Sequence, residues 1–573
     1  MNLYKIYLSE IKKILLKNKK VVNLNSIKDI DNIIIESPPE KFNYDFSSNA
    51  AMIIAKNTKI NPRIIAEKIK EIIIKNSNNF SQIEIAGPGF LNFNLKKEAW
   101  IKIIDHILKS KKNYGSEKMN KKINIEFVSA NPTGPMHVGH CRGAIFGDVL
   151  SNLLKFNGNK VTKEYYVNDY GKQIDDFAKS VFYRLRQLKF NESFPEDQNL
   201  YPGDYVKEIS KKILKDKKIN LDNYKNIQKT LKNLSIKSSM NMIKNDLKHL
   251  GISHDNFFYE SNIVNNNLVN KTIMKLKKNK FIEEGYLQPP KGEIDPNWKK
   301  IKRLIFKSTL FGDDTDRALQ KNDGSWTYFA NDVAYHATKV SKKNDYLINV
   351  LGADHTGYIK RITAAVSALS KNKINLICKV CQLVKLYKNG NPFKMSKRSG
   401  DFITVNDLLK EVNKDVIRFM MLNRGNDVEL DFDFDKVLEK NKENPVYYVQ
   451  YCYARINSLF KVAKINKNSK IILNKNNFMP NIFEYKLLRK ISEWPKIVES
   501  SSKKFEPHKI PIYLYELVTI FHSYWSKGNE ETKFKFVING QIKNKLSIKI
   551  FKLLLIVLEN AMHILGVSLP KKM

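Results

Sequence analysis

The segment that most constrains the fold runs from residue 123 to residue 143 and reads INIEFVSANPTGPMHVGHCRG. Residues 123–128 alternate between apolar and polar side chains and begin with a β-branched residue, which is typical of a strand. Residues 131–135 then form a Pro- and Gly-containing break, and the apolar spacing from Met136 onward predicts a helix. The segment therefore predicts a strand, a turn and a helix in direct succession.

A helix that starts at the carboxyl edge of a sheet offers backbone N–H groups and the positive end of its dipole to an anion. Gly139 has no side chain, so a flat ring could approach the backbone there. His137 and His140 fall on one face of the first helical turn. Two imidazoles in this position can donate hydrogen bonds to a polyphosphate. Two other interpretations stay open for this segment alone: a metal site that also uses Cys141, or ordinary residues at a helix end.

A second basic segment, NPFKMSKRSGDFITVNDLL, occupies residues 391–409. Its cations Lys394, Lys397 and Arg398 are crowded around Ser396, just before a predicted helix. A turn-rich loop of this kind can carry ammonium groups over a phosphate chain. Taken by itself, such a charge cluster is also what a solvated surface presents.

HVGH after a strand and KMSKR later in the chain together resemble the HIGH and KMSKS signatures of class I aminoacyl-tRNA synthetases. Five longer segments resemble the arginyl-tRNA synthetases in that class: EFVSANPTGPMHVGH, EYYVNDYGKQI, YFANDVAYH, GADHTGY and NPVYYVQYCYARI. The resemblance extends from NAAMIIAK near residue 49 to the closing MHILGVSLPKKM. It implies an arginine–tRNA ligase that activates L-arginine with ATP and transfers it to the terminal adenosine of tRNA(Arg).

In the activation step, charge builds up on the phosphate oxygens as the arginine carboxylate attacks the α-phosphate. Positioned cations and hydrogen-bond donors therefore supply most of the catalysis. We expect this catalytic role for His137, His140, Lys394 and Lys397. The residues expected to bind ATP, with Mg2+ accompanying the nucleotide, are Pro132, Gly134, His137, Gly139, His140, Met395, Ser396 and Lys397.

Selecting arginine requires a carboxylate that faces the guanidinium group, because the planar fork makes two parallel hydrogen bonds that an ammonium group cannot reproduce. Tyr328 and Asp332 would share one face if YFANDVAYH forms a helix. By resemblance, Asn131 and Ser129 would hold the amino and carboxylate ends of the substrate. The full arginine site that the resemblance implies comprises Glu126, Ser129, Asn131, Tyr328, Asp332 and His336.

No resident metal is expected. His336, Asp354 and His355 could form a metal cluster, but we favour hydrogen-bonding support of the site. The chain has four cysteines, too few for a disulfide framework in 573 residues, and this cysteine usage fits a reducing cytoplasm. Cys378 and Cys381 form a lone CxxC pair, for which zinc or redox chemistry is the alternative to two small buried residues.

The charge of the chain favours a large polyanionic partner. The chain has 99 Lys plus Arg against 58 Asp plus Glu, a formal net charge of +41. Much of the excess is lysine in a chain also rich in isoleucine and asparagine, as an A/T-biased genome produces, so the charge supports tRNA only weakly. No long uncharged apolar run is present, so no membrane-spanning segment is expected. The amphipathic first 20 residues could lie on a membrane surface, but we favour their packing on the first domain and expect no membrane partner. The resemblance implies a monomer.

The length predicts several domains. Residues 1–112 predict a small α/β domain, which by resemblance contacts the tRNA elbow. Residues 113–440 alternate strands and helices, with a helical insertion at about 190–300, and predict a Rossmann-like, doubly wound parallel sheet. After the insertion, strands are expected at RLIFKST, SWTYFAND and DYLINVLGAD. Residues 441–573 predict an α-helical bundle, which the resemblance assigns to anticodon binding.

Two other functions stay open at this point. A catalytically silent RNA-binding relative would keep the fold, and a nucleotidyl transferase that makes a small activated acid would not need the C-terminal helices. The intact HVGH and KMSKR segments and Asp332 favour the ligase.

Overall fold

A five-stranded, fully parallel sheet lies at the centre of the molecule, in the order β12-β11-β5-β6-β7. Its strand β5 pairs with β6 on one side and with β11 on the other, so the winding direction reverses at β5. In doubly wound sheets, ligands bind at the carboxyl ends of strands at such a switch point. The strands are β5 (Lys122–Glu126), β6 (Lys160–Val167), β7 (Asn256–Tyr259), β11 (Tyr346–Gly352) and β12 (Asn375–Cys381).

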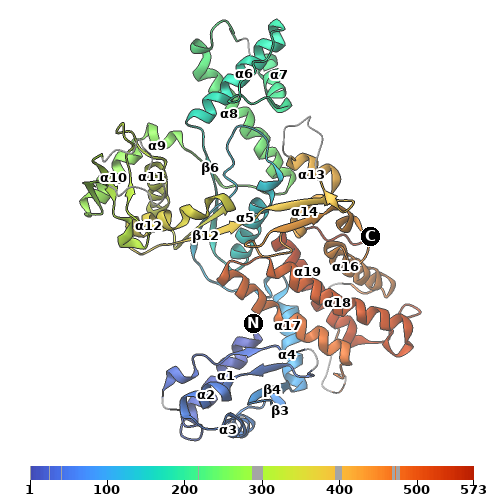
Figure 1. Cartoon of the computed structure of the whole chain (residues 1–573). Coiled ribbons are helices and arrows are strands. Elements are labelled where there is room, and N and C mark those ends of the chain that lie inside the picture. Colours follow the sequence, from blue (N-terminus) through green and yellow to red (C-terminus); the bar gives the residue numbers. More distant parts are fainter. Residues whose placement is uncertain are drawn as a thin grey trace.

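This computed structural model describes residues 2–24, 26–39, 42–216, 219–286, 301–393, 403–466, 471–472, 476 and 478–573. Figure 1 shows the sheet in the middle, the N-terminal domain below it, helices α6–α8 above it, and the C-terminal helices at the lower right. Within the described part of the chain, no helix is long and apolar enough to cross a membrane.

Helix α5 lies against the sheet and is buried on nearly every side, because both the sheet and the C-terminal helices pack on it. The helices of the catalytic region are α5 (Val138–Phe156), α6 (Lys172–Phe190), α7 (Asp204–Asp216), α8 (Tyr224–His249), α9 (Ser261–Asn265), α10 (Leu268–Lys278), α11 (Tyr328–Ser341), α12 (Ile359–Ser370), α13 (Val405–Glu411), α14 (Lys414–Met420) and α15 (Phe434–Leu438).

The predicted insertion at about 190–300 differs from the observed arrangement in one respect. Helices α6–α8 do project away from the sheet, but β7 returns to it as an edge strand inside that range. RLIFKST also forms a strand, although in a separate antiparallel sheet and not in the central one. That sheet contains β8 (Ile282–Gly285), β9 (Arg303–Phe306) and β10 (Arg317–Ala318).

The strand predicted at SWTYFAND was wrong, because this segment starts helix α11. Thr327 is the N-cap, and its hydroxyl accepts a hydrogen bond from the backbone N–H of Ala330 at 3.3 Å. The predicted strand at DYLINVLGAD is confirmed as β11.

The N-terminal region forms a four-stranded antiparallel sheet in the order β1-β2-β4-β3, covered by helices. Its elements are α1 (Leu3–Lys17), β1 (Ile35–Glu36), β2 (Phe46–Ser48), α2 (Ala50–Thr58), α3 (Pro62–Asn76), β3 (Phe80–Ala86), β4 (Phe90–Leu95) and α4 (Lys97–Ser110).

The C-terminal region is a helical bundle, as predicted. Helix α19 is buried on all sides because α4, α5, α16 and α17 surround it. One continuous apolar core therefore runs from Leu3 to Val567 through all three regions. The remaining elements are β13 (Val384–Lys388), β14 (Asn391–Pro392), β15 (Leu430–Asp433), α16 (Pro445–Val462), α17 (Ile482–Lys504), α18 (Lys509–Glu530), β16 (Val537–Ile538), β17 (Gln541–Ile542) and α19 (Lys545–Leu565).

Candidate active site

The candidate site lies at the carboxyl ends of the strands at the switch point and begins with a strained turn after β5. Val128 and Ser129 have positive φ angles of 72° and 44°, and the N–H of Ser129 donates to the Phe127 carbonyl at 3.1 Å. A β-branched residue rarely adopts a positive φ, and such strain is often found at functional sites. The turn directs the Ser129 hydroxyl to Glu126 Oε1 at 3.2 Å and to the backbone N–H of Tyr166 at 3.1 Å.

The two histidines of HVGH cap helix α5 together. His137 is the N-cap: its Nδ1 accepts from the Gly139 N–H at 3.1 Å, and its own N–H donates to His140 Nδ1 at 3.3 Å. The two ring centroids lie 3.8 Å apart. Because each Nδ1 accepts a hydrogen bond, each neutral ring carries its proton on Nε2.

Both histidines are neutral at pH 7. Burial lowers the pKa of His137, and burial together with the neighbouring His137 lowers the pKa of His140 to about 4, although Asp354 acts in the opposite direction. Gly139 is required for this arrangement, since a Cβ there would lie 2.8 Å from Cε1 of His137. Pro132 is buried and Gly134 is half-buried in the turn that precedes the pair.

The second basic segment is joined to HVGH by backbone hydrogen bonds. Lys394, Met395, Ser396 and Lys397 lie outside the described residues. The chain directly after them, residues 403–405, pairs with residues 136–138: Val138 N–H donates to the Ile403 carbonyl and Val405 N–H to the Met136 carbonyl, each at 2.9 Å. We call this pairing the signature joint.

Asp332 is a half-buried carboxylate without an ion-pair partner among the described residues. Burial raises its pKa to about 7, and the negative charges of Glu126 and Glu260 add to this effect. A hydrogen bond from the hydroxyl of Tyr358 and the positive charge of Lys339 partly oppose it. A cationic ligand would relieve this accumulation of negative charge.

Glu126 ends strand β5, but its charge is already matched. Lys339, which is fully buried, forms an ion pair with Glu126 Oε2 and donates to Asn349 Oδ1 at 3.3 Å. The sequence reasoning missed Lys339. Its position seven residues after Asp332 places both residues on one face of α11, and that spacing could have identified it.

Glu260 is a second residue that the sequence reasoning missed. It directly follows β7, is 4% exposed, and accepts a hydrogen bond from Asn331 Nδ2 at 3.2 Å. When the Asn168 amide is oriented to suit its neighbours, its nitrogen donates to Glu260 Oε2 at 2.6 Å. The aromatic run before Glu260 was a strand signal, and the residue was overlooked because that run lay within the predicted insertion.

The other predicted arginine-binding residues occupy different positions. Tyr328 is 73% exposed at the start of α11, one turn before Asp332. Asn131 is exposed and donates to Gln173 Oε1 at 2.9 Å. His336 is buried, and its ring nitrogens pair with the Asp332 carbonyl at 2.9 Å and with Asn349 Nδ2 at 3.0 Å. Burial lowers the pKa of His336 to about 3, so the ring is neutral. Through Asn349 this neutral ring connects α11 to strand β11.

The residues that suggested metal sites lie apart. Cys378 and Cys381 are three apart on β12 and therefore point to opposite faces of the sheet. Asp354 and His355 are exposed, and His355 Nε2 lies 3.4 Å from Asp354 Oδ2. No group of three or more potential ligand side chains is placed to hold a metal in the part of the chain that the structure describes.

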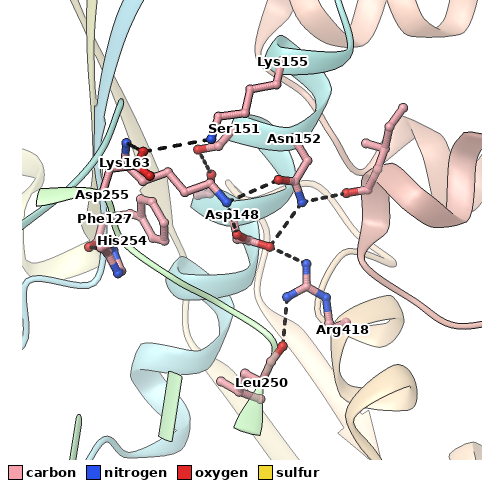
Figure 2. A network of polar contacts seen from close by, with 12 residues as sticks. Phe127, Asp148, Ser151, Asn152, Lys155, Lys163, Leu250, His254, Asp255 and Arg418 are labelled. Atoms are coloured by element: carbon pink, nitrogen blue, oxygen red, sulfur yellow. Dashed lines mark hydrogen bonds and ion pairs between the residues drawn. The ribbon is translucent and has the colours of Figure 1, made fainter. Parts of the chain in front are cut away.

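Helix α5 is anchored by a buried polar network, two to three turns below the histidines (Figure 2). Asp148 accepts from Lys163 Nζ at 2.6 Å and from Arg418 Nη2 at 2.5 Å. Arg418 also donates to the carbonyls of Leu565 at 2.8 Å and Leu250 at 2.9 Å, which lie at the ends of α19 and α8. The network therefore connects the helix that carries the signature to two other regions.

Family models match three successive parts of the chain. The model for the catalytic domain of tRNA synthetases class I (R) matches residues 103–459. The arginyl tRNA synthetase N terminal domain matches residues 8–95, and the DALR anticodon binding domain matches residues 449–573. The fold and the matched catalytic-domain model therefore define a class I tRNA synthetase.

Individual relatives show which family within this class the chain resembles. The chain is 50% identical to an arginine–tRNA ligase of Pelagibacter ubique and 41% identical to one of Bartonella bacilliformis, with 100% of each chain covered in both cases. A putative arginyl-tRNA synthetase structure from Campylobacter jejuni is 29% identical, with a TM-score of 0.73 over 84% of this chain and 100% of that chain. The Thermus thermophilus arginyl-tRNA synthetase, 18% identical with a TM-score of 0.72 over 100% of both chains, shares the fold. The chain belongs to the arginine–tRNA ligase family.

Proposed function

We propose that this chain activates L-arginine with ATP to arginyl-adenylate and transfers the arginyl group to the 3′-terminal adenosine of tRNA(Arg), releasing AMP and pyrophosphate. The observation that carries the proposal is the pair of chemical groups near the end of β5. A neutral histidine pair starts α5 just after β5, and the half-buried carboxylate of Asp332, which has no ion-pair partner among the described residues, interacts with the charge of Glu126 at the end of β5. The first group suits a polyphosphate, and the second suits a cationic amino acid.

In activation, the arginine carboxylate attacks the α-phosphate and pyrophosphate leaves. His137 and His140 would donate from Nε2 to phosphate oxygens, where charge increases. Pro132, Gly134 and Gly139 would shape the turn against the nucleotide, and Lys394 and Lys397, with Met395 and Ser396, would supply the remaining phosphate contacts. Mg2+ would enter bound to the ATP phosphates.

Arginine selection would depend mainly on Asp332. Its carboxylate would accept two parallel hydrogen bonds from the guanidinium group, with Tyr328 one helical turn away. Glu126 is already paired with Lys339, so we assign it, with Ser129 and Asn131, to the amino and carboxylate end of the substrate. His336 would orient Asp332 from behind. Lysine would leave one carboxylate hydrogen bond unmade, which favours its rejection.

The transfer step requires tRNA, and we propose that the C-terminal bundle reads the anticodon. A half-buried cluster there combines an arginine with aromatic rings: the Arg455 guanidinium lies 4.1 Å from the ring of Tyr451 and 5.4 Å from that of Trp525. Such a cluster suits stacking of unpaired bases. Residues 1–112 would contact the tRNA elbow, and the enzyme would act as a cytoplasmic monomer, which its four free cysteines fit.

ATP–pyrophosphate exchange tests the proposal. Exchange should appear with arginine, but not with lysine or the other amino acids, and should be lost in Asp332→Ala. Assays with and without tRNA(Arg) show whether activation depends on the tRNA. If the purified protein binds tRNA but exchanges with no amino acid under either condition, it is a silent RNA-binding relative and the proposal fails.

A further inference from the structure

Helix α8 belongs to the part of the chain that projects from the sheet, yet its second half contacts the signature segments. The Ser239 hydroxyl donates to the Gly134 carbonyl at 3.4 Å. Asp246, seven residues later and so on the same face, accepts from the Met136 N–H through Oδ2 at 3.0 Å. Its other oxygen, Oδ1, accepts from Asn406 Nδ2 at 2.9 Å. One carboxylate therefore holds both sides of the signature joint.

The surroundings of Asp246 indicate that this carboxylate acts as a hydrogen-bond acceptor. It is 1% exposed, and no lysine or arginine in the described part of the chain forms an ion pair with it. Met136 is fully buried, so its N–H would lose its partner without Asp246. Asn406 is exposed, and its Oδ1 lies 3.3 Å from His249 Nδ1. Burial raises the pKa of Asp246 to about 6.

We propose that Asp246 is a positioning residue for amino-acid activation, which holds the HVGH segment and residues 403–406 in one fixed arrangement. His137 lies between Met136 and Val138, the two residues that make the backbone hydrogen bonds of the signature joint. A shift of the joint would therefore displace the histidine pair. Because a misplacement of about 1 Å can cost about 100-fold in rate, the effect falls on turnover. The inference rests on the proposed function.

The test compares three variants in arginine-dependent ATP–pyrophosphate exchange with tRNA(Arg) present. Asp246→Ala removes the acceptor and should lower kcat by about 100-fold, with KM for arginine changed by less than about twofold. Asn406→Ala breaks the same joint at an exposed position and should lower kcat by about fivefold, the effect of one hydrogen bond. Asp246→Asn keeps an acceptor for Met136, and the Asn406 amide can turn to meet the new amide, so activity should stay within about fivefold of wild type.

Asp345→Asn is the matched control. Asp345 also accepts from a backbone N–H, that of Lys122 at 2.8 Å, but it lies at the amino ends of β5 and β11, at the other end of the strands from the proposed site. The Asp345→Asn variant should therefore leave kcat for pyrophosphate exchange unchanged. Amide hydrogen exchange of residues 134–138 and 403–407 gives a second measurement, which Asp246→Ala should accelerate and Asp246→Asn should not.

Three results would overturn the inference: a kcat within twofold of wild type in both alanine variants, equal losses in Asp246→Ala and Asp246→Asn, or unchanged amide exchange in Asp246→Ala. Absence of exchange in the wild-type enzyme would count against the proposed function instead. The joint would then be judged by its amide exchange alone.

Discussion

Gly139 determines whether the two signature histidines can pack as they do. A Cβ at this position would lie 2.8 Å from His137 Cε1, so Gly139→Ala must displace the ring that caps α5. We expect kcat for pyrophosphate exchange to fall by about 100-fold while the protein stays folded. Gly143→Ala is the control on the same helix, since its Cβ would meet nothing nearer than 3.9 Å. Equal activities of the two variants would show that the histidine pair does not depend on Gly139.

The pKa of Asp332 predicts how arginine binding depends on pH. Its pKa of about 7 means that the carboxylate is mostly protonated below pH 7, and only the ionised form can pair with a guanidinium group. KM for arginine should therefore rise by up to about tenfold per pH unit as the pH falls from 7 to 5.5. ATP–pyrophosphate exchange kinetics measured from pH 5.5 to pH 7 test this dependence of KM on pH.

Asp332→Asn provides the comparison. It should bind arginine weakly at every pH, and the steep dependence of KM on pH should disappear. The free enzyme should respond in the opposite way: ionising Asp332 in the folded state costs stability, a cost that grows from pH 4 to pH 7 and then stays constant. The variant should therefore melt at a higher temperature than wild type at pH 8. A wild-type KM that is independent of pH would rule out Asp332 as the guanidinium ligand.

At the scale of elements, α5 depends on the buried network around Asp148. Arg418→Met removes the cation and leaves the carbonyls of Leu250 and Leu565 without their donor. Breaking a buried ion pair from one side costs about 3–5 kcal/mol, so the melting temperature should fall clearly. The control is Lys360→Met, which breaks an exposed pair with Asp314 at 2.8 Å and should cost at most about 1 kcal/mol. Similar melting temperatures for the two variants would contradict a structural role for the network.

The secondary-structure elements also show which parts of the fold the local sequence pattern predicts. Two features could be predicted because each depends on residues close together in the sequence. They are the strand, turn and helix at residues 123–143 and the helices of the C-terminal region. Strand β7 was missed although its aromatic run favours a strand, because its four residues lie within the predicted insertion and join the central sheet only by pairing with β6. The same limit applied to the site: Asp332 could be found from its motif, but the ion pair of Lys339 with Glu126 joins residues 213 positions apart.

At the scale of the whole molecule, the anticodon-binding region is not a separable module. Helix α19 is buried against α4 and α5 as well as against its own bundle, so deleting residues 445–573 would expose the shared core. Retained or lost activity in that truncation would therefore report on folding. Point variants in the surface cluster of Tyr451, Arg455 and Trp525 are the informative test of RNA binding.

Tyr451→Ala should separate the two steps of the reaction. It removes a ring that stacks on Arg455 and Tyr447 and leaves the residues of the proposed active site at the central sheet unchanged. Stacking of a base on an aromatic ring contributes about 1–3 kcal/mol, so KM for tRNA(Arg) in aminoacylation should rise by about tenfold or more. With saturating tRNA(Arg), the exchange rate should stay near wild type. Tyr451→Phe keeps the ring and loses only the hydroxyl that Arg455 contacts at 3.0 Å, so it should bind tRNA nearly as well as wild type. If both variants bind tRNA normally, the bundle reads the anticodon through another surface.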